Sequence, residues 1–151
     1  MAMAYALLLP LLMILAAPFG VYGEKYSFPG KELANAITLR WNDAVKSPLR
    51  IVCGGYLAPD SIAFHAPDHP SVLQHLNFVM SPWINRQDIR KHGMAIVCLQ
   101  KDTLCRRNAQ SQFKLDNWQS LQVGGSAKRF SHSREERFLF VFISPIPDKA
   151  L

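Results

Sequence analysis

One stretch in the second half of the chain constrains the fold more than any other: residues 84–99, INRQDIRKHGMAIVCL. Asn85 is a favoured helix N-cap residue, and Asp88 stands three positions later, as in a capping box. Gly93 follows the basic residues of the last turn, where a glycine commonly ends a helix. The apolar run after it shows no alternation, which is typical of a strand buried on both faces of a parallel sheet. The stretch therefore predicts an α/β domain.

The remaining sequence continues this alternation. Residues 31–46 predict a helix, because Leu33, Ile37, Trp41 and Ala44 recur at helical spacing. Further helices are predicted after Pro59, through Ile62 and Phe64, and over residues 101–113 with Asp102 as N-cap. Strands are predicted at residues 49–55, 71–79, 94–99, 118–123 and 137–145. Because the last two strands are joined by a polar turn, we expect a small α/β sandwich with a mixed sheet and a terminal hairpin.

The first residues of the chain form a separate segment. Met1 to Gly23 carries no charged side chain and is long enough to cross a bilayer, which takes about 20 apolar residues. A signal peptide, which would carry a positive n-region, and a buried core helix are the alternatives. We predict a transmembrane helix over 1–23, a linker over 24–30 and an extracytoplasmic α/β domain over 31–147. The abrupt start is typical of the last helix of a longer membrane protein.

The formal net charge of +6 is spread along the sequence. Its one modest basic cluster is interrupted by two glutamates and consists of Lys128, Arg129, Arg134 and Arg137. This pattern favours a solvated surface, and contact with anionic lipid head groups is the next interpretation. We expect membrane lipid and no nucleic acid among the partners.

The chain has three cysteines, at positions 53, 98 and 105, and none belongs to a CxxC pair. This spacing disfavours a zinc knuckle. Cys53 and Cys98 lie in apolar runs, where a thiol is usually a small core residue. A disulfide stays open as an alternative if the domain is exported.

Residues 61–75, SIAFHAPDHPSVLQH, resemble a metal site at first sight. The candidate ligands are His65, Asp68, His69 and His75. His65 and His69 have the spacing of zinc ligands on one helix. Pro67 and Pro70 make a continuous helix improbable there, because each removes a backbone donor and restricts its neighbour. We therefore interpret the stretch as a turn between a helix and a strand and predict no metal.

No motif for covalent or acid–base catalysis is evident, so we assign no catalytic residue and no cofactor. Asp60 and Asp68 are explained as surface caps, and Trp83 in WINRQDIR by packing. The glycine pair of RIVCGG follows a predicted strand, at the end where open α/β sheets bind ligands. We therefore predict Gly54, Gly55 and Tyr56 as ligand-binding residues.

An ordered set of phrases adds a resemblance. It comprises FPGKELANAITLRW, PLRIVCGGYLAPDSIAFHAPDHPSV, SPWINRQDIRKHGMAIVC and RFLFVFISPIP. In this order, from about Gly23 onward, the chain resembles the C-terminal region of bacterial glycosyltransferase family 39 membrane proteins, which are dolichyl-phosphate-mannose-protein mannosyltransferase-like. The resemblance implies a domain outside the cytoplasm, behind the last membrane helix of a polytopic enzyme that uses polyprenyl-phosphate sugars.

The family's catalytic acidic residues are expected in its first extracytoplasmic loop, which has no counterpart in this sequence. We therefore transfer no catalytic residue, and enzymatic activity of this chain stays undecided. The leading hypothesis is a membrane-anchored accessory domain, part of such a glycosyltransferase or acting beside its polytopic core. It would cross the bacterial inner membrane once, with the domain in the periplasm. The alternative is a stand-alone, membrane-tethered envelope protein that binds a sugar or a lipid head group.

Overall fold

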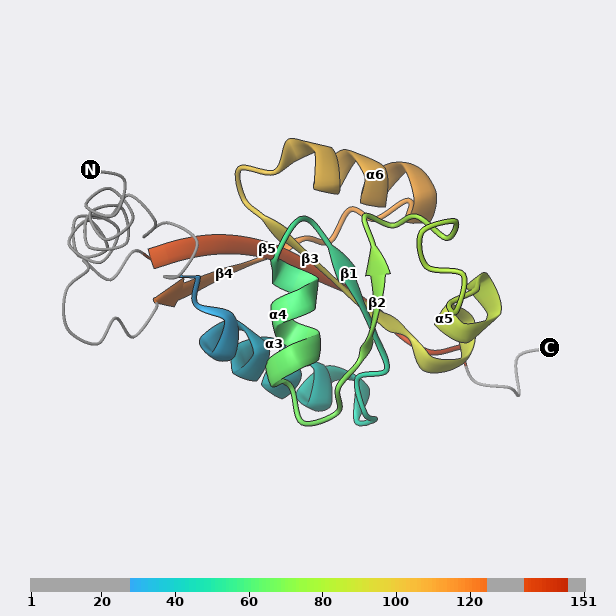
Figure 1. The fold of residues 1–151 in the computed structure, drawn as a ribbon, viewed down its shortest axis with the longest axis horizontal. Coiled ribbons are helices and arrows are strands. Elements are labelled where there is room, and N and C mark those ends of the chain that lie inside the picture. Colours follow the sequence, from blue (N-terminus) through green and yellow to red (C-terminus); the bar gives the residue numbers. More distant parts are fainter. Residues whose placement is uncertain (1–27, 125–134, 147–151) are drawn as a thin grey trace, which may run out of the picture.

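The computed structural model describes residues 28–124 and 135–146. In this part of the chain, a five-stranded sheet carries helices on both faces (Figure 1). The elements in chain order are α3 (Gly30–Val45), β1 (Ile51–Gly54), α4 (Ala58–His65), β2 (Ser71–Gln74), α5 (Arg86–His92), β3 (Met94–Leu99), α6 (Thr103–Phe113), β4 (Gln119–Gly124) and β5 (Glu135–Ile143). The predicted α/β class is confirmed.

The sheet is mixed, as the sequence predicts, with the strand order β2-β1-β3-β5-β4. Strand β1 runs parallel to both of its neighbours, β2 and β3. The last two strands form the expected antiparallel hairpin, and β5 also pairs antiparallel with β3, so that Met94 lies opposite Ile143. The end of β5 therefore lies beside the start of β3, at the amino end of the parallel strands.

The stretch from Asn85 to Leu99 folds as its sequence predicts. The Asn85 side chain accepts hydrogen bonds from the backbone N–H groups of Gln87 and Asp88 at 2.8 and 2.9 Å, and Asp88 Oδ2 accepts from Asn85 N–H at 2.9 Å. This reciprocal capping box fixes the start of α5. Gly93 ends it with a φ of 73°, and a Cβ there would lie 2.5 Å from the Ile143 carbonyl oxygen. Glycine is therefore the residue that fits where α5 turns into β3.

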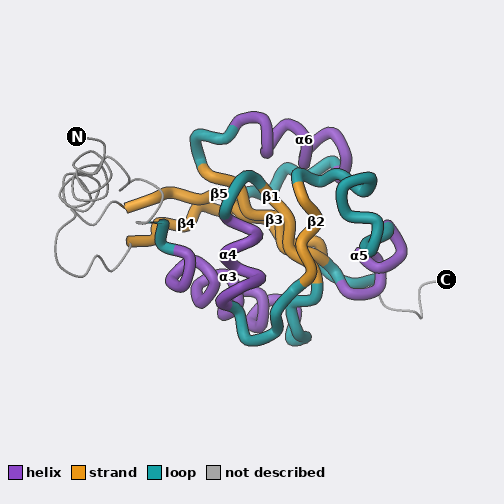
Figure 2. The backbone as a smooth tube through the Cα atoms, viewed as in Figure 1, coloured by secondary structure: helices purple, strands orange, loops and turns teal. Residues whose placement is uncertain are grey.

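The helices cover the sheet from two sides (Figure 2). On one side α3 and α4 pack on the sheet through the buried Leu33, Ile37, Trp41 and Ile62, against Phe138 and other core residues. On the other side α5 and α6 cover a second core. Strand β3 is buried on both faces because alternate residues enter the two cores, Ala95 and Val97 the first, Met94, Ile96 and Cys98 the second. Each large apolar side chain buried in this way contributes about 1.5 to 3 kcal/mol to folding.

Two local expectations are wrong. Ala44 is exposed at the end of α3, although the apolar periodicity places it on the buried stripe. The second strand ends at Gln74 instead of Val79, because His75 and Leu76 adopt φ values of 51° and 59°, which turn the chain out of the sheet. Leu76 then packs into the second core.

The predicted membrane helix over residues 1–23 lies outside the described residues, as does most of the predicted linker. Among the helices of residues 28–124 and 135–146, none has the length and apolarity needed to span a bilayer. The membrane segment therefore stays a prediction from the sequence.

Candidate functional site

The predicted ligand-binding residues lie at the carboxyl end of β1, and both glycines are packed against protein atoms. A Cβ on Gly54, whose φ is 156°, would lie 1.8 Å from the Val97 carbonyl oxygen of β3. A Cβ on Gly55 would lie 2.3 Å from Asp102 Oδ2. Gly54 therefore permits β1 and β3 to approach closely, and Gly55 permits the same for the segments that follow the two strands. Tyr56 is exposed, and ligand binding by these three residues stays a prediction.

A disulfide ties the same end of the sheet to α6. It joins Cys98 of β3 to Cys105 in the first turn of the helix, with a Cα–Cα distance of 5.9 Å. Asp102 caps this turn, because its Oδ1 accepts a hydrogen bond from Cys105 N–H at 3.0 Å. Cys98 is buried in the second core, as its apolar run predicts, and it forms the disulfide that the sequence left open. The description as a small core thiol therefore applies to one cysteine only. It holds for Cys53, a free cysteine whose burial raises the pKa of its thiol well above the ordinary value.

The histidine-rich stretch forms the predicted turn between α4 and β2. His65 ends α4, and its side chain is exposed, as are those of His69 and His75. Asp68 accepts a hydrogen bond from Leu49 N–H at 3.0 Å, so its carboxylate connects the turn to the segment just before β1. Within the described ranges, no group of three or more histidine, cysteine or acidic residues is placed to hold a metal ion.

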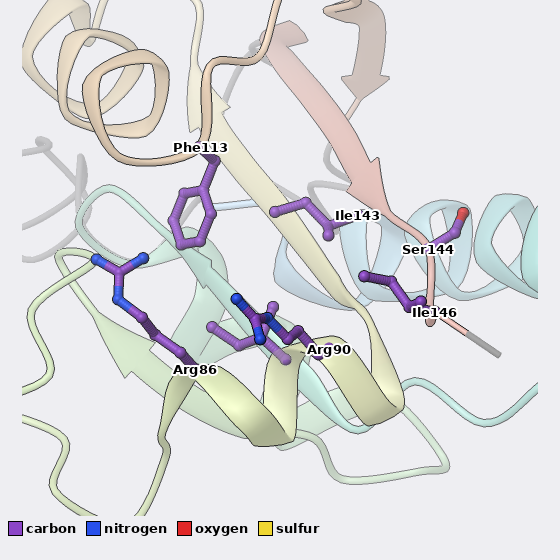
Figure 3. Close-up of a pocket in the computed structure, with 7 residues that line it drawn as sticks. Arg86, Arg90, Phe113, Ile143, Ser144 and Ile146 are labelled. Carbon is purple, nitrogen blue, oxygen red and sulfur yellow. The ribbon is translucent and has the colours of Figure 1, made fainter. Parts of the chain in front are cut away.

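A cavity of about 150 Å³ lies at the opposite end of the sheet, between α5, the end of α6 and the end of β5. We call it the arginine cavity. Figure 3 shows the side chains of Arg86 and Arg90 rising from α5, with Phe113 of α6 and Ile143 of β5 facing them across the cavity. Its wall is thus apolar on the sheet side and basic on the side of α5.

The backbone places both arginines on the same side of the helix. They are four residues apart, a spacing at which side chains of a helix are neighbours, and Ile89 between them is buried in the second core. The chain after β5 closes the cavity, because Ile146 N–H donates a hydrogen bond to the Arg90 carbonyl oxygen at 2.8 Å. The position of α5 is therefore held at its start by the capping box and near its end by this contact.

The charge of the cavity is positive. No carboxylate is among the described residues that line it, and Asp88, the acidic residue of α5, is engaged in the capping box. The Arg86 guanidinium lies 5.3 Å from the centre of the Phe78 ring, a cation–π arrangement that orients it without neutralising it. Two exposed cations beside an apolar wall can bind an anionic group that carries an apolar substituent.

The residues of the arginine cavity are not among those that the sequence predicts to bind a ligand. The basic residues of the last turn, Arg90 among them, fit the pattern of a capped helix. Trp83 is expected to be explained by packing, but its side chain is 60% exposed. The sequence RQDIR does indicate a basic helix face, because its two arginines have helical spacing and the aspartate between them belongs to the predicted capping box.

The chain matches no protein-family model, no curated protein and no solved structure. The resemblance to glycosyltransferase family 39 therefore stays a prediction from the quoted phrases.

Proposed function

We propose that the domain is a binding module for the phosphate end of an amphipathic ligand, held in the arginine cavity. In this proposal it acts as a membrane-anchored accessory domain, outside the cytoplasm, of a polyprenyl-phosphate-sugar-dependent glycosyltransferase. The observation that carries the proposal is the pair Arg86 and Arg90, which meet an apolar wall with no carboxylate among the lining residues.

The chemistry of the cavity defines the ligand class. Arginine guanidinium groups bind phosphate and carboxylate oxygens through charge-assisted hydrogen bonds. Phe113, Ile143 and Ile146 offer apolar contacts beside them. A phosphate bonded directly to a hydrocarbon, as in a prenyl phosphate, satisfies both parts of this surface.

The size of the cavity limits what it holds. About 150 Å³ is the volume that accommodates one benzene-sized group, and it is below the range of roughly 300 to 1,000 Å³ for pockets that enclose a drug-sized ligand. The cavity therefore takes the phosphate and the first few carbons of a longer molecule, and the rest of the chain would extend outside the domain.

The disulfide supports the proposed location. Disulfides persist in secreted, periplasmic and surface proteins and are rare in the cytosol, and Cys98 and Cys105 form one. The alternative of a stand-alone, membrane-tethered envelope protein shares this location and the same phosphate-bearing ligand. The two proposals differ in whether the chain works together with a polytopic membrane enzyme.

Ligand binding is tested with the purified full chain and dimethylallyl phosphate, a water-soluble prenyl phosphate, by isothermal titration calorimetry. We expect saturable binding that weakens at least about tenfold in an Arg86→Gln/Arg90→Gln variant, because each charge-assisted hydrogen bond contributes about 1.5 to 3 kcal/mol. The matched control is Arg50→Gln/Arg107→Gln, which removes the same charge from two exposed arginines elsewhere and should bind as the parent chain does.

Two further ligands separate the parts of the proposal. Inorganic phosphate supplies the charge without the apolar substituent, and dimethylallyl alcohol supplies the substituent without the charge. Each should bind more weakly than dimethylallyl phosphate. Equal affinity of the arginine variant and its control for dimethylallyl phosphate would contradict the proposed site.

The accessory role needs a separate measurement. The chain is added to a family 39 glycosyltransferase core from which the C-terminal domain has been removed, and sugar transfer from a polyprenyl-phosphate sugar is measured. Restored transfer with the parent chain, but not with Arg86→Gln/Arg90→Gln, supports the accessory role. Absence of any effect on transfer, with ligand binding intact, favours the stand-alone binding protein.

A further inference from the structure

Residues 77–84, the segment between β2 and α5, present apolar side chains to the solvent. We call this segment the apolar loop. Val79, Met80 and Trp83 are 89%, 49% and 60% exposed, respectively. Single exposed apolar residues are common on protein surfaces, whereas several together mark a contact with another apolar phase.

The loop is held in place by its own hydrogen bonds. Ser81 is fully buried, and its Oγ accepts a hydrogen bond from Gln74 N–H at 3.0 Å. Asn77 Oδ1 accepts from Val79 N–H at 2.9 Å and from Met80 N–H at 3.4 Å. These contacts fix the backbone so that the apolar side chains cannot easily turn inward.

Both ends of the loop are also anchored in the second core. Leu76, just before it, and Ile84, at its end, are 2% and 4% exposed. The Leu76 carbonyl oxygen accepts a hydrogen bond from the Gln112 side chain of α6 at 3.0 Å. The exposed side chains therefore stand on a rigid base, which lowers the entropic cost of binding.

Basic side chains adjoin the apolar loop. Arg86, Arg90 and Lys91 of the following helix are exposed, and Arg86 lies over the ring of Phe78 within the loop. The one acidic residue of α5, Asp88, is used by the capping box. The partner that complements this surface is apolar next to the loop and anionic next to α5.

We propose that the apolar loop inserts Val79, Met80 and Trp83 into the interfacial layer of a bilayer that contains anionic phospholipid, while α5 contacts the head groups. Tryptophan is enriched at membrane–water interfaces, and each lysine or arginine near an anionic leaflet adds to the attraction. Apolar side chains next to a basic helix match the composition of interfacial membrane contacts.

This inference goes beyond the proposed ligand binding: insertion depends on Val79, Met80 and Trp83, which do not line the arginine cavity, whereas Arg86 and Arg90 take part in both proposals. It places the mouth of the arginine cavity at the membrane surface, where the hydrocarbon of a prenyl phosphate resides. Helix α3 begins at the opposite end of the domain from α5 (Figure 1). Together with the predicted membrane helix before α3, the loop would give the domain membrane contacts at both ends, and its long side would lie along the bilayer.

The experiment uses the full chain reconstituted in vesicles of phosphatidylcholine with brominated acyl chains, with or without phosphatidylglycerol. Bromine quenches the fluorescence of tryptophans that reach the acyl region. The chain has three tryptophans; Trp41 is buried in the first core, and Trp118 packs against the second. Since residues 1–23 contain no tryptophan, the predicted membrane helix contributes no signal.

We expect quenching that is stronger with phosphatidylglycerol and that disappears in Trp83→Phe. In Val79→Ser/Met80→Ser, which keeps Trp83 as the reporter, quenching should fall by about half or more, because the apolar area for insertion is lost. Leu104→Ser removes a comparably exposed apolar side chain from α6 and should leave quenching unchanged.

Quenching that persists in Trp83→Phe, or that is equal in Val79→Ser/Met80→Ser and the parent chain, would overturn insertion of the loop. Quenching that is independent of phosphatidylglycerol would overturn the role of α5. The two proposals fail separately, because dimethylallyl phosphate binding is measured without vesicles. Val79→Ser/Met80→Ser should retain that binding, whether or not the loop inserts.

Discussion

The two ends of the parallel strands are built in opposite ways. At the carboxyl end, Gly54 packs against Val97, Gly55 packs against Asp102, and the disulfide closes the start of α6. At the amino end, α5 packs on the second core through Ile89 and leaves the arginine cavity between itself, the end of α6 and the end of β5. Open α/β sheets commonly bind ligands at the carboxyl end of their strands. In this domain, close packing occupies the positions nearest β1 and β3 there, and the arginine cavity, which no carboxylate among the described residues lines, lies at the other end.

We expect the carboxyl end of the parallel strands to contribute to stability and the amino end to contribute to ligand binding. Substitutions at the carboxyl end should change the free energy of unfolding, because they disturb buried contacts. Substitutions of the two exposed arginines of the arginine cavity should change ligand binding and leave the free energy of unfolding almost unaltered. The following variants test this division, and urea-induced unfolding of the full chain, followed by tryptophan fluorescence, measures each effect.

Gly54→Ala should have the largest effect. Its φ of 156° is unfavourable for alanine, and the new Cβ would lie 1.8 Å from a backbone oxygen of β3, which cannot turn away. Backbone strain and overpacking together predict a loss of about 3 to 5 kcal/mol of unfolding free energy. The unfolding midpoint in urea is the measurement, and failure to accumulate folded protein is the extreme form of the same result.

Gly124→Ala is the matched control within the sheet. A Cβ at Gly124 would meet its nearest atom, Cγ of Glu135, at 3.9 Å, an ordinary contact. Alanine should therefore be neutral or slightly stabilising at this position. If Gly54→Ala and Gly124→Ala had equal effects, the close contact between β1 and β3 would not be what requires glycine at position 54.

Loss of the disulfide should have the second largest effect. Cys98 and Cys105 close a short loop, with a sequence separation of 7, and the chain-entropy relation predicts about 2 to 3 kcal/mol for a loop of this length. The double variant Cys98→Ala/Cys105→Ala should unfold at lower urea concentration. Reducing agent should shift the parent chain in the same direction and leave the double variant unchanged, because Cys53 is unpaired.

Asp102→Ala should cost about 1 kcal/mol, the usual contribution of a helix N-cap. Asp102 also occupies the space beside Gly55, so the two positions should be coupled. Gly55→Ala should be clearly less destabilising in the Asp102→Ala background than in the parent chain, by about 1 kcal/mol in a double-mutant cycle. Additive effects would show that Gly55 is required for another reason.

Most of the fold could be predicted from the sequence, because it depends on local patterns. The capping box at Asn85, the buried run of β3 and the Asp102 cap each depend on residues a few positions apart. The end of β2 could not be predicted in this way. SVLQHLNFV looks like one continuous strand. The contacts that accompany the turn after Gln74 come from residues farther along the chain, because the Ser81 hydroxyl accepts from Gln74 N–H and Gln112 of α6 binds the Leu76 carbonyl oxygen.

The candidate site was harder to predict because its parts come from distant segments. Phe113 ends α6 and Ile143 ends β5, and nothing in the sequence near Arg86 indicates that these residues face it. The disulfide could not be predicted for a related reason, since three cysteines do not specify which two of them pair. The sequence pattern predicted a ligand site at the carboxyl end of the sheet. Whether a basic side chain can bind an anion depends on whether nearby carboxylates are engaged in other contacts, and those contacts are visible only in the folded domain.

The smallest change in stability should come from the arginine cavity itself. Arg86→Gln/Arg90→Gln alters two exposed side chains and should change the unfolding free energy by no more than about 0.5 kcal/mol per site, as surface substitutions usually do. Removing two nearby like charges can even be slightly stabilising, because arginines at this helical spacing repel each other. Retained stability with lost dimethylallyl phosphate binding would show that this charge serves binding. A loss comparable to that of the disulfide variant would instead mean that the arginines hold α5 in place, and the contrast between the two ends of the sheet would no longer stand.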